Sequence, residues 1–145
     1  MMRTIFIFIF CLFLSSCATS SLSTMQRRSI EAKELEGNFD DAFKATLQVL
    51  QDNGYIIKNT DYKAGVIQGE TGEKQGFWTY YNHEVTATIE QFGENRVKER
   101  VTFVYKSGDG VWAAKKSNII EDPKFLQKIY DDIQKEIFVR QNLNK

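Results

Sequence analysis

Apolar residues recur at helical spacing in two segments of the chain. The first segment reads "NFDDAFKATLQVLQDNG", and its apolar stripe, widened by small side chains, is Phe39, Ala42, Phe43, Thr46, Leu47, Val49 and Leu50. Asn38 is a suitable N-cap for this helix, and Gly54 is a suitable stop. The second segment reads "EDPKFLQKIYDDIQKEIFVRQ", with Asp122 as N-cap, Pro123 at the first helical position and the stripe Leu126, Ile129, Tyr130, Ile133 and Ile137. The pattern therefore predicts two amphipathic helices.

Between these helices the spacing of apolar residues changes to every second position, which is typical of β-strands. Two short strands are expected in "YIIKN" and "GVIQGET", around a turn at Asn59–Gly65. A longer hairpin joins "HEVTATIEQF" to "RVKERVTFVY" through a loop at residues 93–95. Before the first helix, "RRSIEAKELEG" alternates weakly and predicts one more strand.

The longer hairpin has one register that keeps its apolar side chains together. A slip of one residue would mix core and solvent faces, so the pattern selects this register. On the core face it pairs Val85 with Phe103 and Ala87 with Val101, and on the other face Glu90 with Lys98 and Thr86 with Thr102. The predicted fold is an α+β two-layer domain over residues 26–145, with an antiparallel sheet of about four to five strands and two helices packed on one face.

The N-terminus has a different pattern from the rest of the chain. It reads "MMRTIFIFIFCLFLSSC", with Arg3 before an apolar run from Ile5 to Leu14 and then small residues. This layout is typical of a secretory signal peptide, here residues 1–16. The run is too short for a membrane span, which needs roughly 20 apolar residues. The alternative is a buried N-terminal strand or helix.

The residues Leu14-Ser15-Ser16-Cys17 resemble the lipobox of bacterial lipoproteins. The resemblance implies that Cys17 carries diacylglycerol on its sulfur and becomes the acylated first residue, with fatty acids such as palmitate, after cleavage. Cys11 would leave with the signal peptide. Ala18 follows the cysteine, and the absence of an Asp there favours sorting to the periplasmic face of the outer membrane. Residues 17–25 are Ser/Thr-rich and predict a flexible tether.

The predicted domain carries a second resemblance. The stretches "LQDNGYIIKNTDYKAGVIQGE" and "DPKFLQKIYDDIQKEIF" resemble small bacterial outer-membrane lipoproteins that have no assigned chemistry. The layout is also similar to the helix-grip domains of the lipoprotein subunits that accompany outer-membrane barrel assembly. These motifs are structural, a helix stop and a helix start, so they transfer no functional residue.

Composition limits the chemistry that the chain can perform. It has 19 basic and 19 acidic residues, so no basic field favours nucleic acid. With one histidine, and with Cys17 acylated, neither a Cys/His zinc site nor a Cys-His nucleophile pair is expected. No serine stands in a Gly-x-Ser-x-Gly turn. We therefore expect no cofactor, no metal and no enzymatic activity, although sequence cannot place the opposed carboxylates that a glycosidase needs.

Aromatic residues before the longer hairpin are the remaining candidates for a site. His83 shares a face with Val85 and lies opposite Tyr105, as a histidine at the core edge or as a pH-responsive contact. In "GFWTYYNHE", Trp78 and Tyr80 fall on the other face or project from the hairpin, and Trp112 of "SGDGVWAAKKSN" joins them. The alternative is that they cover the end of the sheet.

These observations favour a lipid-anchored, non-enzymatic binding or assembly module with a protein partner in the cell envelope. Its candidate interaction surface is Trp78, Tyr80 and Trp112, and its membrane anchor is Cys17. One alternative is a lipoprotein that binds a small ligand or a glycan on the aromatic surface. Another is an enzyme with a carboxylate site that the sequence does not reveal.

Overall fold

An antiparallel sheet and two helices make up the described part of the chain. A computed structural model describes residues 32–72, 74–75, 79–109, 116–120 and 122–143. The helices are α3 (Phe39–Asp52) and α4 (Pro123–Leu143). The strands are β1 (Ala32–Glu36), β2 (Ile56–Asp61), β3 (Val66–Glu70), β4 (Lys74–Gln75), β5 (Thr79–Gln91), β6 (Arg96–Asp109) and β7 (Lys116–Ile119). The sheet order is β1-β6-β5-β3-β2, with β4 paired to β5 and β7 paired to β6. The predicted α+β class is confirmed.

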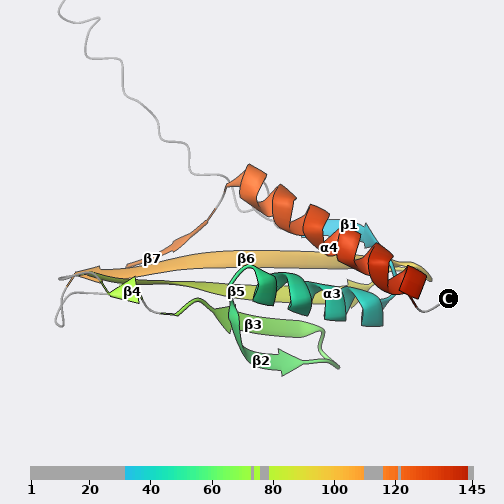
Figure 1. Cartoon of the computed structure of the whole chain (residues 1–145), viewed down its shortest axis with the longest axis horizontal. Coiled ribbons are helices and arrows are strands. Elements are labelled where there is room, and N and C mark those ends of the chain that lie inside the picture. Colours follow the sequence, from blue (N-terminus) through green and yellow to red (C-terminus); the bar gives the residue numbers. More distant parts are fainter. Residues whose placement is uncertain (1–31, 73, 76–78, 110–115, 121, 144–145) are drawn as a thin grey trace, which may run out of the picture.

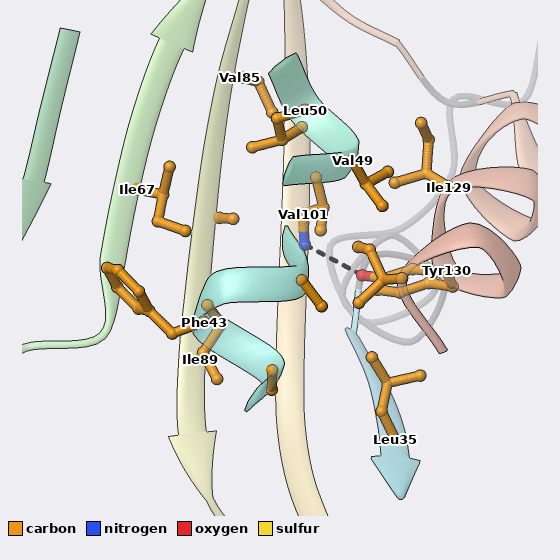
Figure 2. Packing of buried hydrophobic residues seen from close by; sticks show 14 of the residues in the cluster. Leu35, Phe43, Val49, Leu50, Ile67, Val85, Ile89, Val101, Ile129 and Tyr130 are labelled. Atoms are coloured by element: carbon orange, nitrogen blue, oxygen red, sulfur yellow. Dashed lines mark hydrogen bonds between the residues drawn. The ribbon is translucent and has the colours of Figure 1, made fainter. Parts of the chain in front are cut away.

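Both helices bury their apolar stripes against the same face of the sheet (Figures 1 and 2). The sheet contributes the alternate residues of its strands, and each helix contributes the stripe that its spacing predicts. The fully buried apolar members from the sheet are Ile67, Val85, Ala87, Ile89, Val97, Val101 and Phe103, and those from the helices are Ala42, Ala45, Leu50, Leu126, Ile129, Tyr130, Ile133 and Ile137. The apolar area that these residues remove from water is the main stabilising contribution to the fold.

The predicted helix ends are confirmed by their capping contacts. Asn38 has an extended backbone, and its Oδ1 accepts a hydrogen bond from the amide of Asp41 at 2.9 Å. Gly54 follows α3 with a φ of +85°, a left-handed conformation that suits a residue without a β-carbon. At the start of α4, Asp122 Oδ1 accepts from the amide of Lys124 at 2.9 Å. Side chains thus pair some of the amides that a helix start leaves unpaired.

The register of the longer hairpin is also confirmed. In β5 and β6, Val85 lies opposite Phe103, Ala87 opposite Val101, Glu90 opposite Lys98, and Thr86 opposite Thr102. The shorter hairpin differs from its prediction, because β2 continues two residues past Asn59, with a register shift between Ile57 and Asn59. The turn therefore begins after Asp61 and ends, as predicted, at Gly65, which has a φ of +66° and where a β-carbon would overlap the carbonyl oxygen of Ile89.

The prediction was a sheet of about four to five strands. Within the described residues the sheet has seven. β4 has two residues, and β7 reads KSNI, so neither shows an alternating apolar pattern. Both pair through their backbones with the long hairpin. β4 pairs with Tyr80 and Tyr81, and β7 pairs with Val104–Ser107 of β6. Sequence periodicity does not detect strands of this kind.

A tyrosine hydroxyl fills a break along the outer edge of β6. On that edge β1 pairs with residues 96–100 and β7 pairs with residues 104–107. Between them, the amide of Val101 donates a hydrogen bond to the hydroxyl of Tyr130 at 3.0 Å, drawn as the dashed line in Figure 2. The amide of Ile120 donates to the carbonyl of Phe103 at 2.9 Å. The Tyr130 contact therefore fixes α4 against the sheet.

Candidate functional site

The long hairpin extends beyond both helices at one end of the sheet (Figure 1). The last row that the helices cover is Val85–Phe103. The ring of Phe103 there packs against Phe125 at 4.9 Å and against Tyr55 at 5.6 Å, measured between ring centroids. β4 and β7 flank the extension, so the strand order in it is β4-β5-β6-β7. We call this part of the molecule the hairpin extension.

The hairpin extension carries an aromatic cluster of Tyr81, His83 and Tyr105. These residues share the strand face of Val85 and Phe103, so they continue the core face of the sheet past the helices. The His83 and Tyr105 rings meet edge to face with centroids 5.3 Å apart, and the Tyr81 and Tyr105 centroids are 6.5 Å apart. Tyr81 is 38% exposed, and the other two are half-buried.

The backbone beneath the aromatic cluster is firmly held. Thr71, just past β3, accepts a hydrogen bond from the amide of His83 through its side-chain oxygen at 2.9 Å. The amide of Thr71 donates to the carbonyl of His83 at 2.8 Å. Next to His83, Glu84 forms an ion pair with Lys106 across the two strands. The cluster is therefore presented on a paired, preorganised backbone rather than on a loop.

The predicted interaction surface is only partly within the described residues. Trp78 and Trp112 lie outside them, as does the predicted lipid-bearing Cys17. Tyr80 occupies a position in β5 opposite Gly108 of β6 and Gln75 of β4. The predicted pairing of His83 with Tyr105 is confirmed. The position of Tyr81 could also have been predicted from the sequence. Tyr81 lies two residues before His83, so in the same strand the two side chains share a face.

Glu99 is a second unusual residue, and the sequence analysis missed it. It lies on the core face of β6 between Val97 and Val101, and it is completely buried. Burial in apolar surroundings raises the pKa of its carboxyl to about 8. The signal was present in the alternation of β6, which places residue 99 on the same face as its buried neighbours.

The hydrogen bonds around Glu99 also indicate a neutral carboxyl. The side-chain oxygen of Thr46 lies 2.9 Å from Glu99 Oε1 and 2.8 Å from the carbonyl oxygen of Ala42. Thr46 has one hydroxyl proton, so it can donate to only one of these two oxygens. Both contacts are hydrogen bonds when a protonated Glu99 donates to Thr46 and Thr46 donates to Ala42. Glu99 is sealed in the core, so it acts on the stability of the fold and not on a substrate.

Two open surface hollows lie along α4. The smaller one, about 210 Å³, lies between α3 and α4 and includes Val49, Asp52, Asp132 and Glu136. A hydrogen bond from Lys128 holds the pKa of Asp132 below its usual value, which keeps this carboxylate ionised. In the part of the chain that the structure describes, no three His, Cys, Asp or Glu residues are grouped as metal ligands.

Comparison with known proteins adds no family to the fold class that the structure shows. Neither a protein-family model nor a curated protein sequence matches this chain. Within the described ranges, no helix has the length and apolar content needed to span a membrane. The chain is an α+β protein in which two helices cover one face of an antiparallel sheet and leave the end of its longest hairpin beyond them.

Proposed function

We propose that this chain is a lipoprotein of the cell envelope, anchored through Cys17 to the periplasmic face of the outer membrane. Its domain acts as a non-enzymatic binding or assembly module, and it takes a protein partner on the hairpin extension. The observation that carries the binding role is the aromatic cluster of Tyr81, His83 and Tyr105, which continues the core face beyond the helices.

Two features of the N-terminus support the anchoring role. Residues 1–16 have the layout of a signal peptide, and residues 14–17 resemble a lipobox. A single acyl chain binds a bilayer only marginally, whereas two or more hold a protein stably. An acylated Cys17 would therefore keep the domain at the membrane, with residues 18–25 as its tether.

The physical character of the aromatic cluster supports protein binding. Tyrosine combines a large apolar ring with a polar hydroxyl and loses little conformational entropy on binding, so it is enriched in protein interfaces. The strands that carry the cluster are paired on both sides, which lowers the cost of ordering the surface.

Site-specific photo-crosslinking in intact envelopes tests the partner surface. A photoreactive side chain at position 81 should capture one protein, and the same side chain at position 62 should not. Tyr62 is a matched control, because it is a tyrosine with 50% exposure in the turn of the shorter hairpin. The double variant Tyr81→Ala with Tyr105→Ala should abolish capture by a reporter placed at position 79, and Tyr62→Ala should retain it.

The other outcomes of this experiment separate the alternatives. Equal capture from positions 81 and 62 would remove the hairpin extension from the proposal. The variant Trp78→Ala with Tyr80→Ala tests whether the surface also includes the aromatic residues that the sequence indicated. The glycan-binding alternative would be favoured if the photoreactive side chain formed no protein adduct and its capture of other material were abolished by added purified envelope glycan.

Mass spectrometry of the N-terminal peptide tests the anchor independently. We expect a mature chain that begins at Cys17 and carries the mass of a diacylglycerol and an acyl group. An unmodified Cys17, or a chain that retains Arg3, contradicts the anchoring part of the proposal.

A further inference from the structure

The C-terminal end of α4 exposes three large apolar side chains. Phe138 is 65% exposed, Val139 is 45% exposed and Leu143 is 79% exposed. Earlier turns of the same helix present exposed polar residues to solvent, among them Lys124, Gln127, Lys128 and Asp131. The outward face of α4 therefore changes from charged to mainly apolar over its last two turns, where Asn142 is the exposed polar residue. We call Phe138, Val139 and Leu143 the apolar end.

The apolar end lies at the opposite end of the sheet from the hairpin extension (Figure 1). Contacts among the described residues fix this position. Gly37, which follows β1, packs against Ile137 and Gln141 of α4, and its amide donates to the carbonyl of Asn95 at 3.0 Å. The end of β1, the turn between β5 and β6, and the last turns of α4 therefore meet at one place. Phe92, in that turn, is also largely exposed.

We propose that the apolar end inserts into the lipid leaflet that holds Cys17, and so sets the orientation of the domain on the membrane. This inference rests on the proposed lipid anchor. It assigns a lipid surface to the apolar end, and it leaves the aromatic cluster of the hairpin extension directed away from the membrane.

The place where the tether joins the domain favours this orientation. Ala32 lies opposite Arg100, four residues from the turn end of β6 at Arg96 and nine residues from its other end at Asp109. At about 3.3 Å per residue, Ala32 is about 13 Å from the turn end and about 30 Å from the far end. The described part of the domain therefore begins nearer to the apolar end than to the hairpin extension.

The length of chain between the anchor and the described domain also permits this contact. Fifteen residue steps separate Cys17 from Ala32. A chain of that length can span up to about 50 Å when extended. This reach exceeds the separation of about 13 Å between Ala32 and the turn end of the sheet, so the anchor and the apolar end can reach one leaflet together.

The charges beside the apolar end are balanced. Arg140 forms an ion pair with Glu136 at 2.9 Å, and Lys135 lies 3.5 Å from a carboxylate oxygen of Asp132. Insertion would therefore depend on apolar burial rather than on anionic lipid. A second copy of the chain is a poorer occupant, because stable protein interfaces bury roughly 1,000 Å² or more, and three side chains supply much less.

Insertion of the apolar end would place the two ends of the domain at different heights above the leaflet. Nine residues of β6 separate Arg96, at the turn end, from Tyr105 in the aromatic cluster. That corresponds to about 30 Å along the strand. With the apolar end in the lipid, the cluster would face the periplasmic space, where a protein partner can reach it.

Depth-dependent quenching in liposomes tests this orientation. The full acylated chain is purified and reconstituted into phosphatidylcholine vesicles that contain lipids with a nitroxide on the acyl chain. Because the thiol of Cys17 would be occupied by lipid, a cysteine introduced by Phe138→Cys or Leu143→Cys is the one that reacts with a fluorescent label. Gln127→Cys is the matched control for Phe138→Cys, since it lies on the same side of α4 about three turns earlier.

We expect quenching at positions 138 and 143 to be at least fivefold stronger than at position 127. Equal quenching at the three positions overturns the proposal. Self-quenching at position 138 that rises with protein density also overturns it, because it would mean that a second copy covers the apolar end. The mass of Cys17 is measured on the same sample, so a missing anchor is recognised separately. In that case Cys17→Ser is added to each variant before labelling, so that the introduced cysteine is again the one that reacts. These variants are mixed with preformed vesicles, where failure to bind likewise rejects the lipid assignment.

Discussion

Raising the pH from about 4.5 to about 8 should destabilise this protein through Glu99, over a range in which carboxyls are usually already ionised. In the folded chain the pKa of Glu99 is about 8, whereas its ordinary value is 4.5. Between these values the unfolded chain is ionised at this position and the folded chain is protonated, so unfolding releases a proton. The contribution of Glu99 to stability is therefore complete below pH 4.5 and is lost as the pH rises through 8.

The size of this effect follows from the same interval. Each pH unit changes the free energy of unfolding by about 1.4 kcal/mol, so the interval from 4.5 to about 8 corresponds to about 5 kcal/mol. This amount is a large fraction of the typical stability of a domain, which is roughly 5–15 kcal/mol.

The surroundings of Glu99 explain why no cation compensates for its burial. α3 contributes the Thr46 hydroxyl, and β5 contributes the apolar side chain of Ile89. Lys33 of β1 lies opposite Glu99 in register, but its ammonium lies 3.6 Å from a carboxylate oxygen of Asp131 on α4. The same ammonium lies 5.8 Å from the ring centroid of Tyr130, the α4 residue whose hydroxyl contacts the backbone of β6.

Glu99→Gln is the informative variant, because a carboxamide can still donate to Thr46 but cannot ionise. Urea unfolding, followed by circular dichroism from pH 5 to pH 9, measures the free energy of unfolding of both chains. Between pH 5 and pH 8 the unmodified chain should lose about 4 kcal/mol more stability than the variant. Glu90→Gln, on the exposed face of the same hairpin, should keep the full pH dependence. An unchanged pH dependence in Glu99→Gln would refute the argument.

Two further substitutions test the contacts that hold the sheet together. Tyr130→Phe should cost about 1–3 kcal/mol of stability, because it leaves the buried amide of Val101 without its acceptor, and urea unfolding at pH 6 measures the loss. Gly65→Ala should cost more than Gly54→Ala in the same assay. Both residues have a positive φ, which costs a non-glycine residue about 1–2 kcal/mol, but only the β-carbon at position 65 would overlap a carbonyl oxygen. Equal losses at the two glycines would contradict the predicted overlap.

The elements that the sequence predicted correctly are those with long apolar patterns. The stripes of α3 and α4 each extend over several turns, and their caps are short-range signals that tertiary contacts do not override. The register of β5 and β6 was predictable because a slip of one residue would pair core-facing side chains such as Val85 and Phe103 with solvent-facing ones. The two short strands were not predictable, because β4 has two residues and β7 has four, and neither carries an alternating apolar pattern.

The candidate site was harder to predict, because the exposure of a residue on the sheet depends on how far the helices extend along the strands. A helix rises about 1.5 Å per residue and a strand about 3.3 Å, so the 14 residues of α3 span about 21 Å and the 14 residues of β6 about 46 Å. Helices of this length cannot cover strands of this length. Alternation placed His83 on the core face correctly, but only the lengths show that this face continues beyond the core. The same mismatch gives the molecule two distinct ends, and the proposed anchor and partner surface occupy opposite ones.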